Sequence, residues 1–154
     1  MTTPRLQQFS STLDSSGLAA ALAVLNGGVA HRYTALYQLQ GGLLRNLELH
    51  DKQNEVRPEF LLEVPLETSF CQFVLRDGLF RTSDSGGDSR LDGHPYQGVM
   101  VSYHGVPLVD SSGGVLGTLC HFDVEALDLS DTEFELLQQA AQRLPAFLGA
   151  GTSS

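Results

Sequence analysis

The most constraining feature of the sequence is an amphipathic pattern near its carboxyl end. Ser130 and Glu133 form a Ser-x-x-Glu capping box, an arrangement that begins many α-helices. Apolar residues then recur at intervals of three and four along one stripe: Phe134, Leu137, Ala141, Leu144 and Leu148. A helix of this kind has to bury its apolar stripe against another element. The preceding segments must therefore supply a second layer.

Two pairs of short apolar segments supply that layer. Residues 32–39 alternate with a period of two and are joined by Gln40-Gly41-Gly42 to a second run over residues 43–50, which predicts a β-hairpin. Residues 99–108 and 115–123 flank a Gly-rich turn and predict a second hairpin. Antiparallel hairpins framed by helices indicate an α+β fold, in which the helices at the two ends of the chain share one face of the sheet.

Two more helices are expected before the second hairpin. Residues 17–25 are rich in strong helix formers, and Asn26-Gly27-Gly28 supply left-handed residues that end a helix. Residues 68–75 are apolar without alternation and are followed by Asp77-Gly78, which predicts a short buried helix. A loop rich in Gly, Ser and Asp follows it, from residue 84 to residue 95. This helix and loop are left to cover the second face of the sheet.

The length of 154 residues fits one domain. We expect a polar amino-terminal segment over residues 1–16, the domain over 17–148 and a flexible tail over 149–154. The 18 acidic and 9 basic side chains give a formal net charge of −9 with no basic stretch, which argues against nucleic-acid binding. A signal-peptide pattern and an 18-residue apolar window are both absent from the sequence, so we expect a cytoplasmic protein without membrane contact.

Several short motifs, taken in order from about Gly17 to Leu148, resemble the GAF domains of bacterial signalling proteins. The motifs are Val64-Pro65-Leu66 before Ser69-Phe70-Cys71, Asp84 with Asp88 and Arg90, the segment 103–108, and Gly113 before the segment 116–123. The resemblance implies a GAF-like or PAS-like sheet of five or six antiparallel strands, with a ligand pocket beneath the short helix and the loop. It also implies a sensory domain that binds a small molecule and acts in a homodimer or on a signalling protein in trans.

The predicted pocket draws its side chains from the short helix, the loop and the second hairpin. Each residue also has an interpretation that needs no ligand. The two thiols and Tyr103 could be core residues, and the loop residues could form a solvated turn or an exposed ion pair. Adjacent strand residues point to opposite faces, so either Tyr103 or His104 faces the terminal helices. These residues identify neither a ligand nor a cofactor. The predicted ligand-binding residues are Ser69, Cys71, Asp84, Asp88, Arg90, Tyr96, Tyr103, His104 and Cys120.

The sequence favours no metal site. Cys120 and His121 are neighbours on an expected strand and cannot both reach one ion. Asp84, Asp88 and Asp92 recur every four residues, whereas a calcium loop of the EF-hand type needs oxygens at its first, third and fifth positions. We therefore expect an ordinary turn-rich loop there.

The alternative to a binding module is a thiol enzyme. One GAF branch consists of free methionine-R-sulfoxide reductases, which work through cysteine thiolates and a disulfide. Alignment with that branch places Cys71 on one of its cysteines, but Gln97 stands at the position that matches its catalytic cysteine. Because thiol chemistry requires its nucleophile, we expect a binding domain without catalytic residues.

Overall fold

Six antiparallel strands form one sheet with the order β3-β2-β1-β6-β5-β4. The computed structural model describes residues 4–53, 63–65, 69–95 and 97–152, with side chains described as far as residue 145. Strands β1 (Tyr33–Gln40) and β2 (Leu43–Asp51) are the first predicted hairpin, and β5 (Ser102–Val109) and β6 (Val115–Asp123) are the second. The short strands β3 (Glu63–Pro65) and β4 (Phe80–Thr82) form the two edges. The predicted α+β fold is confirmed.

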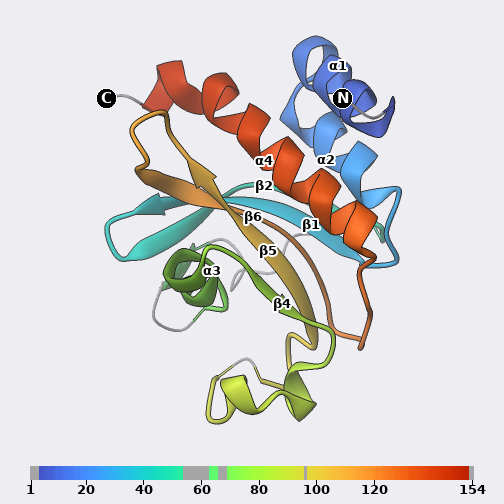
Figure 1. Ribbon diagram of the computed structural model, residues 1–154, viewed down its shortest axis with the longest axis vertical. Coiled ribbons are helices and arrows are strands. Elements are labelled where there is room, and N and C mark those ends of the chain that lie inside the picture. The colour runs from blue at the N-terminus through green and yellow to red at the C-terminus, as the bar shows by residue number, and fades with distance from the viewer. Residues whose placement is uncertain (1–3, 54–62, 66–68, 96, 153–154) are drawn as a thin grey trace.

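Helices cover both faces of this sheet (Figure 1). Helices α1 (Pro4–Ser16), α2 (Leu18–Asn26) and α4 (Asp131–Thr152) lie together on one face, and α3 (Cys71–Asp77) lies on the other. Each face has its own cluster of buried apolar side chains. We call these two sides the helical face and the α3 face.

Helix α4 begins where the capping box predicts. The backbone N–H of Glu133 donates to Ser130 Oγ over 3.2 Å, whereas the Glu133 carboxylate pairs with Arg5 of α1. The apolar stripe is buried on the helical face as far as it is described, through Phe134, Leu137, Ala141 and Leu144. The helix continues to Thr152, so the predicted tail is helical over residues 149–152.

The amino-terminal segment packs against the rest of the chain, although the sequence predicts a domain boundary at residue 17. Residues 4–16 form helix α1, and Leu6, Phe9 and Leu13 are only 4%, 0% and 4% exposed. These three residues recur at spacings of three and four, so they share one face of the helix. They pack into the same core as the stripe of α4. The polar residues that dominate this segment lie mainly on the outer face of the helix.

Helix α2 ends differently from the prediction. Gly27 is right-handed, with a φ of −63°, so no left-handed residue closes the helix at this position. The buried amide of Asn26 instead turns the chain by donating to the carbonyl of His31 over 3.0 Å. At Gly28, an added Cβ would lie 2.3 Å from the guanidinium of Arg5 and would displace it. That guanidinium donates to the carbonyl of Val24 over 2.8 Å, which ties α1 to the end of α2.

Helix α3 forms where a short buried helix is predicted, but it spans residues 71–77 and not 68–75. Cys71, Phe73 and Val74 are buried, and Gly78 closes the helix with a left-handed φ of 84°. Within the described part of the chain, no helix has both the length and the apolar character needed to cross a membrane.

Candidate functional site

The register of the central strands decides which side chains reach the α3 face. Tyr103 on β5 is paired with Phe122 on β6, and Gly105 is paired with Cys120. Tyr103, Cys120 and Phe122 all belong to the cluster beneath α3. Aromatic rings from several elements make up much of the same cluster: Tyr33, Tyr37, Phe70, Phe73, Phe80, Tyr103 and Phe122.

Three polar groups meet beneath α3 inside this aromatic cluster. Cys71 is the first residue of α3, and its sulfur lies 3.1 Å from the Tyr103 hydroxyl and 3.2 Å from Thr118 Oγ1. The exposures of Cys71, Tyr103 and Thr118 are 5%, 5% and 0%. We call these three side chains the polar floor.

Burial keeps the polar floor uncharged. Removal from water raises the pKa of the Cys71 thiol, and it raises the pKa of Tyr103 well above its ordinary value. Burial also raises the pKa of Cys120 well above its usual range. A protonated thiol is a weak nucleophile, so these groups are suited to hydrogen bonding and not to covalent attack. The start of α3 therefore does not activate Cys71.

Gly105 sets the position of the Tyr103 ring. A Cβ at residue 105 would lie 2.7 Å from Tyr103 Cε1 and 2.8 Å from its hydroxyl oxygen. The ring therefore leans over the glycine along the strand. This placement brings the hydroxyl to the sulfur of Cys71.

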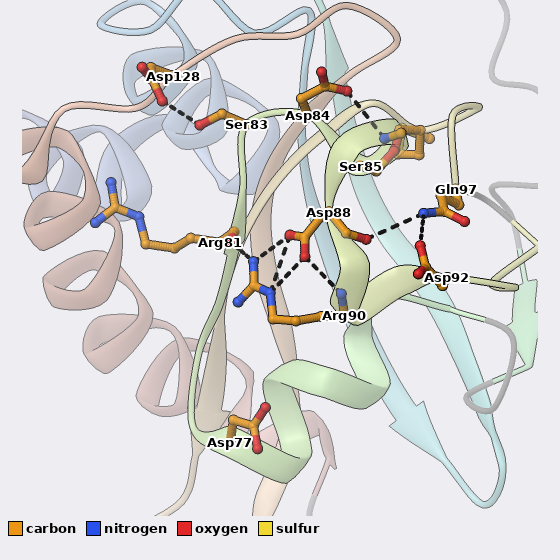
Figure 2. A network of polar contacts seen from close by, with 12 residues as sticks. Asp77, Arg81, Ser83, Asp84, Ser85, Asp88, Arg90, Asp92, Gln97 and Asp128 are labelled. Atoms are coloured by element: carbon orange, nitrogen blue, oxygen red, sulfur yellow. Dashed lines mark hydrogen bonds and ion pairs between the residues drawn. The ribbon is translucent and has the colours of Figure 1, made fainter.

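The loop over residues 84–95, which we call the acidic loop, forms a separate network beside the α3 face (Figure 2). Arg90 donates to both carboxylate oxygens of Asp88 and, over 2.8 Å, to the carbonyl of Arg81 on β4. Its guanidinium also stacks 4.7 Å from the centre of the Phe80 ring. The hydrogen bonds from Arg90 lower the pKa of Asp88 to about 2. The charges of Arg90 and Asp88 therefore compensate each other.

Two short 3₁₀ turns give the loop its shape. Asp84 caps the first, η3 (Ser85–Gly87), by accepting from Gly86 N over 3.2 Å. Asp88 caps the second, η4 (Ser89–Leu91), by accepting from Arg90 N over 3.1 Å. Gln97 then donates to the carbonyl of Asp88 over 3.3 Å and to the carboxylate of Asp92 over 3.1 Å. Local hydrogen bonds therefore order this loop, as the turn-rich composition predicts.

The predicted pocket residues thus separate into groups. Ser69, Cys71, Tyr103 and Cys120 are buried, and the last three belong to the α3-face cluster. Asp84, Asp88 and Arg90 belong to the loop network (Figure 2), and the Arg90 guanidinium stacks on Phe80 of the cluster. Tyr96 lies outside the described residues. Thr118, which sequence reasoning missed, completes the polar floor.

His104, also predicted as a pocket residue, lies on the other face of the sheet and not with Cys71 and Tyr103. It faces the helices, where its ring lies 5.0 Å from that of His31, centre to centre. Strand alternation explains the result, because Tyr103 faces α3 and the next residue must face the other side. The choice between the two residues required the sheet register.

A shallow hollow also lies at the surface between α1 and α2. Its one charged side chain, Arg5, already pairs with Glu133 and with the carbonyl of Val24. We therefore assign no ligand to it. The residues that line it are Arg5, Gln8, Ala23, Val24, Gly27 and Gly28.

Solved structures identify the architecture. The GAF domain of a phosphoenolpyruvate-protein phosphotransferase from Acinetobacter superposes with a TM-score of 0.78 at 15% identity, over 99% of this chain and 97% of that one. The chain has a GAF fold. The phycocyanobilin-bound GAF domain of a cyanobacterial phytochrome gives a TM-score of 0.70 at 13% identity, over 97% and 96% of the two chains. The resemblance predicted from the motifs is thus confirmed for the fold.

An enzyme with the same fold is also similar in structure. The free methionine-R-sulfoxide reductase from Neisseria meningitidis, solved in complex with its substrate, has a TM-score of 0.69 at 18% identity, over 94% of this chain and 89% of that one. No protein-family model and no curated protein sequence matches the chain. At identities this low, the structural similarity establishes only the architecture, so the function has to be argued from the site.

Proposed function

We propose that the chain is a cytoplasmic sensory domain that binds a small molecule beneath α3. The observation that carries this proposal is the polar floor of Cys71, Tyr103 and Thr118 within an aromatic cluster. Binding sites for small molecules are mostly apolar walls with a few placed polar groups that fix the orientation of the ligand. Similar folds have been solved with a bound bilin and with a bound enzyme substrate.

The chemistry of the site favours an uncharged ligand with a ring. The polar floor is neutral at pH 7, because burial raises the pKa values of both Cys71 and Tyr103. Arg90, whose guanidinium stacks on the Phe80 ring of the cluster, is paired with Asp88. The neighbouring rings include Phe70 and Phe73, which offer faces for stacking. A free carboxylate or phosphate would find no unpaired cation among these residues.

A thermal-shift screen tests this proposal. We expect uncharged ring-containing metabolites to include a binder, and a hundredfold excess over its dissociation constant should stabilise the fold by about 2.7 kcal/mol. For a chain of this length that corresponds to a rise in Tm of roughly 5–11 °C.

Matched variants locate the binding. Tyr103→Phe removes one hydroxyl of the polar floor and should reduce the ligand-induced shift. Tyr33→Phe, which removes a hydroxyl elsewhere in the same cluster, should leave the shift unchanged. A ligand whose shift is the same in wild type, Tyr103→Phe and Thr118→Val does not use the polar floor, and that result would contradict the proposed site.

We propose that the signal leaves through the terminal helices, either in a homodimer or towards a signalling protein in trans. The apolar side chains of α2 do not require a partner, since Leu22 and Leu25 are buried within the protomer and Leu18 is partly buried. A dimer interface would therefore use other surfaces. Light scattering over a hundredfold concentration range should give the mass of a dimer, and a monomer at every concentration would leave only the partner in trans.

The reductase alternative has less support from the site. Its chemistry requires a thiolate, but burial raises the pKa values of both Cys71 and Cys120. Gln97, at the position matched to the catalytic cysteine, is bonded to the acidic loop. We expect no reduction of free methionine sulfoxide with dithiothreitol beyond that of a Cys71→Ser, Cys120→Ser double variant. Turnover above that control would establish the enzyme.

A further inference from the structure

Three histidines are buried together on the helical face. His104 on β5 and His121 on β6 are directly paired across the two strands, and His31 comes from the connection between α2 and β1. The His31 ring lies 5.0 Å from that of His104 and 6.0 Å from that of His121, centre to centre. The exposures of His31, His104 and His121 are 0%, 1% and 1%. We call these three residues the histidine cluster.

The histidine cluster contains ring nitrogens without hydrogen-bond partners. In the described part of the chain, neither nitrogen of His31 has a partner, and Nδ1 of His104 has none. A buried polar atom without a hydrogen bond destabilises the fold, so such an arrangement calls for an explanation. A metal ion does not provide one, because the described His, Cys, Asp and Glu side chains include no group of three arranged to hold an ion.

A chain of hydrogen bonds joins the histidine cluster to the end of α2. Asn26, the last residue of α2, donates to Thr34 Oγ1 over 2.8 Å. Thr34 Oγ1 lies 2.6 Å from Nδ1 of His121. Because the hydroxyl oxygen accepts from Asn26, its own proton is free to be donated to a neutral His121. A protonated His121 would instead present an N–H to this hydroxyl, and the bond would have to reverse.

The charges around the cluster have mixed signs. The acidic groups facing it are Asp123 on β6 and Asp128 before α4, and the basic groups are Lys52 after β2, Arg5 on α1 and Arg81 on β4. Helix α2 contributes no ionisable side chain, and Glu133 of α4 is paired with Arg5. Burial is the largest influence and lowers the pKa of all three histidines. The rings are therefore neutral at pH 7.

We infer that the histidine cluster is a proton-sensitive latch, which holds the end of α2 on the sheet while its rings are neutral and releases it when they are protonated. Release lets the imidazolium rings reach water, which removes the cost of a buried charge. The helix that moves is one of those on the face opposite the polar floor. This device is independent of the proposed ligand site.

The size of the effect follows from His104. Burial lowers its pKa to about 3, whereas in the opened state the pKa returns to about 6.5. Stability is then complete above pH 6.5 and is lost as the pH falls towards the folded value. Between pH 7 and pH 5 this one group raises the opening constant roughly 25-fold. Any contribution from His31 and His121 has the same sign, since their pKa values are also lowered.

Hydrogen exchange of the full chain, followed by NMR at pH 7 and pH 5, tests the latch. After correction for the intrinsic exchange rate, amides of residues 21–26 in α2 should lose at least 25-fold in protection. Amides at the centre of the sheet, such as those of Leu119 and Cys120, should keep theirs. In the variant His104→Leu, the loss of protection in α2 between pH 7 and pH 5 should be smaller than in wild type by a factor of roughly 25. His94→Gln, which changes a histidine packed against Phe70 on the α3 face, should leave the loss unchanged.

Three results would overturn the latch. The first is equal protection of α2 at both pH values, and the second is a parallel loss in α2 and the central strands, which would be global acid unfolding. In the third, the Cε1 proton resonances of His31 and His104 would titrate with midpoints near 6.5 while α2 stays protected. The latch predicts that these resonances change only as α2 opens.

Discussion

Replacement of Phe9 by alanine tests whether the amino-terminal helix belongs to the folded unit. The Phe9 side chain is 0% exposed and lies in the same cluster as Phe134 and Leu137 of α4. A buried Phe→Ala substitution costs about 3–5 kcal/mol, because it removes apolar contacts and leaves a cavity. That is a large part of the roughly 5–15 kcal/mol that stabilises a typical domain. For a chain of this length, Tm should fall by roughly 6–20 °C.

Urea and thermal unfolding, monitored by far-ultraviolet circular dichroism, provide the measurement, since the chain contains no tryptophan. Gln7→Ala is the matched control, because Gln7 is exposed on the same helix and its replacement should change stability by no more than about 0.5 kcal/mol. A loss below about 1 kcal/mol for Phe9→Ala would mean that α1 packs only loosely on the domain. The boundary at residue 17 would then be the better description.

Other residues give equally direct tests. Gly105→Ala should shift the NMR resonances of the Tyr103 ring, because the added Cβ would lie 2.8 Å from its hydroxyl oxygen; unchanged resonances would contradict the close approach. Ellman's reagent should label neither Cys71 nor Cys120 before unfolding and both in urea, since both are buried, and rapid labelling of the folded protein would contradict their burial. Wild type should lose stability as the pH falls from about 4 towards 2, since the folded pKa of Asp88 is about 2 and its ordinary value is 3.8. Asp88→Asn lacks this contribution and should show a smaller loss. Urea unfolding at pH 7 and pH 3 checks this, and an equal loss in the variant would contradict it.

Long periodic segments made most of the fold predictable. The capping box with its stripe, and the two hairpins with their glycine turns, gave α4 and four of the strands because each pattern covers many residues. Strands β3 and β4 have three residues each, which is too short for a period to be recognised. Helix α1 did carry a signal in the spacing of Leu6, Phe9 and Leu13, but the polar residues around this narrow stripe obscured it.

The candidate site was only partly predictable, because its composition depends on register and on tertiary contacts. Alternation showed that Tyr103 and His104 face opposite sides, but the pairing of β5 with β6 and the helices was needed to decide which side each faces. Thr118 became part of the polar floor only through its distance to Cys71. The histidine cluster combines a connecting segment with two strands, and no local pattern links His31 to the other two.

The central claim is that a small molecule binds beneath α3, and mapping of a bound compound by NMR tests it most directly. A binder found in the thermal-shift screen would be added to isotope-labelled protein, and the shifts of the backbone amides would be followed during the titration. The claim predicts that the largest shifts lie in α3 and around Cys71, Tyr103 and Thr118. Shifts confined to α1, α2 and α4, or the absence of any binder among uncharged ring compounds, would contradict it.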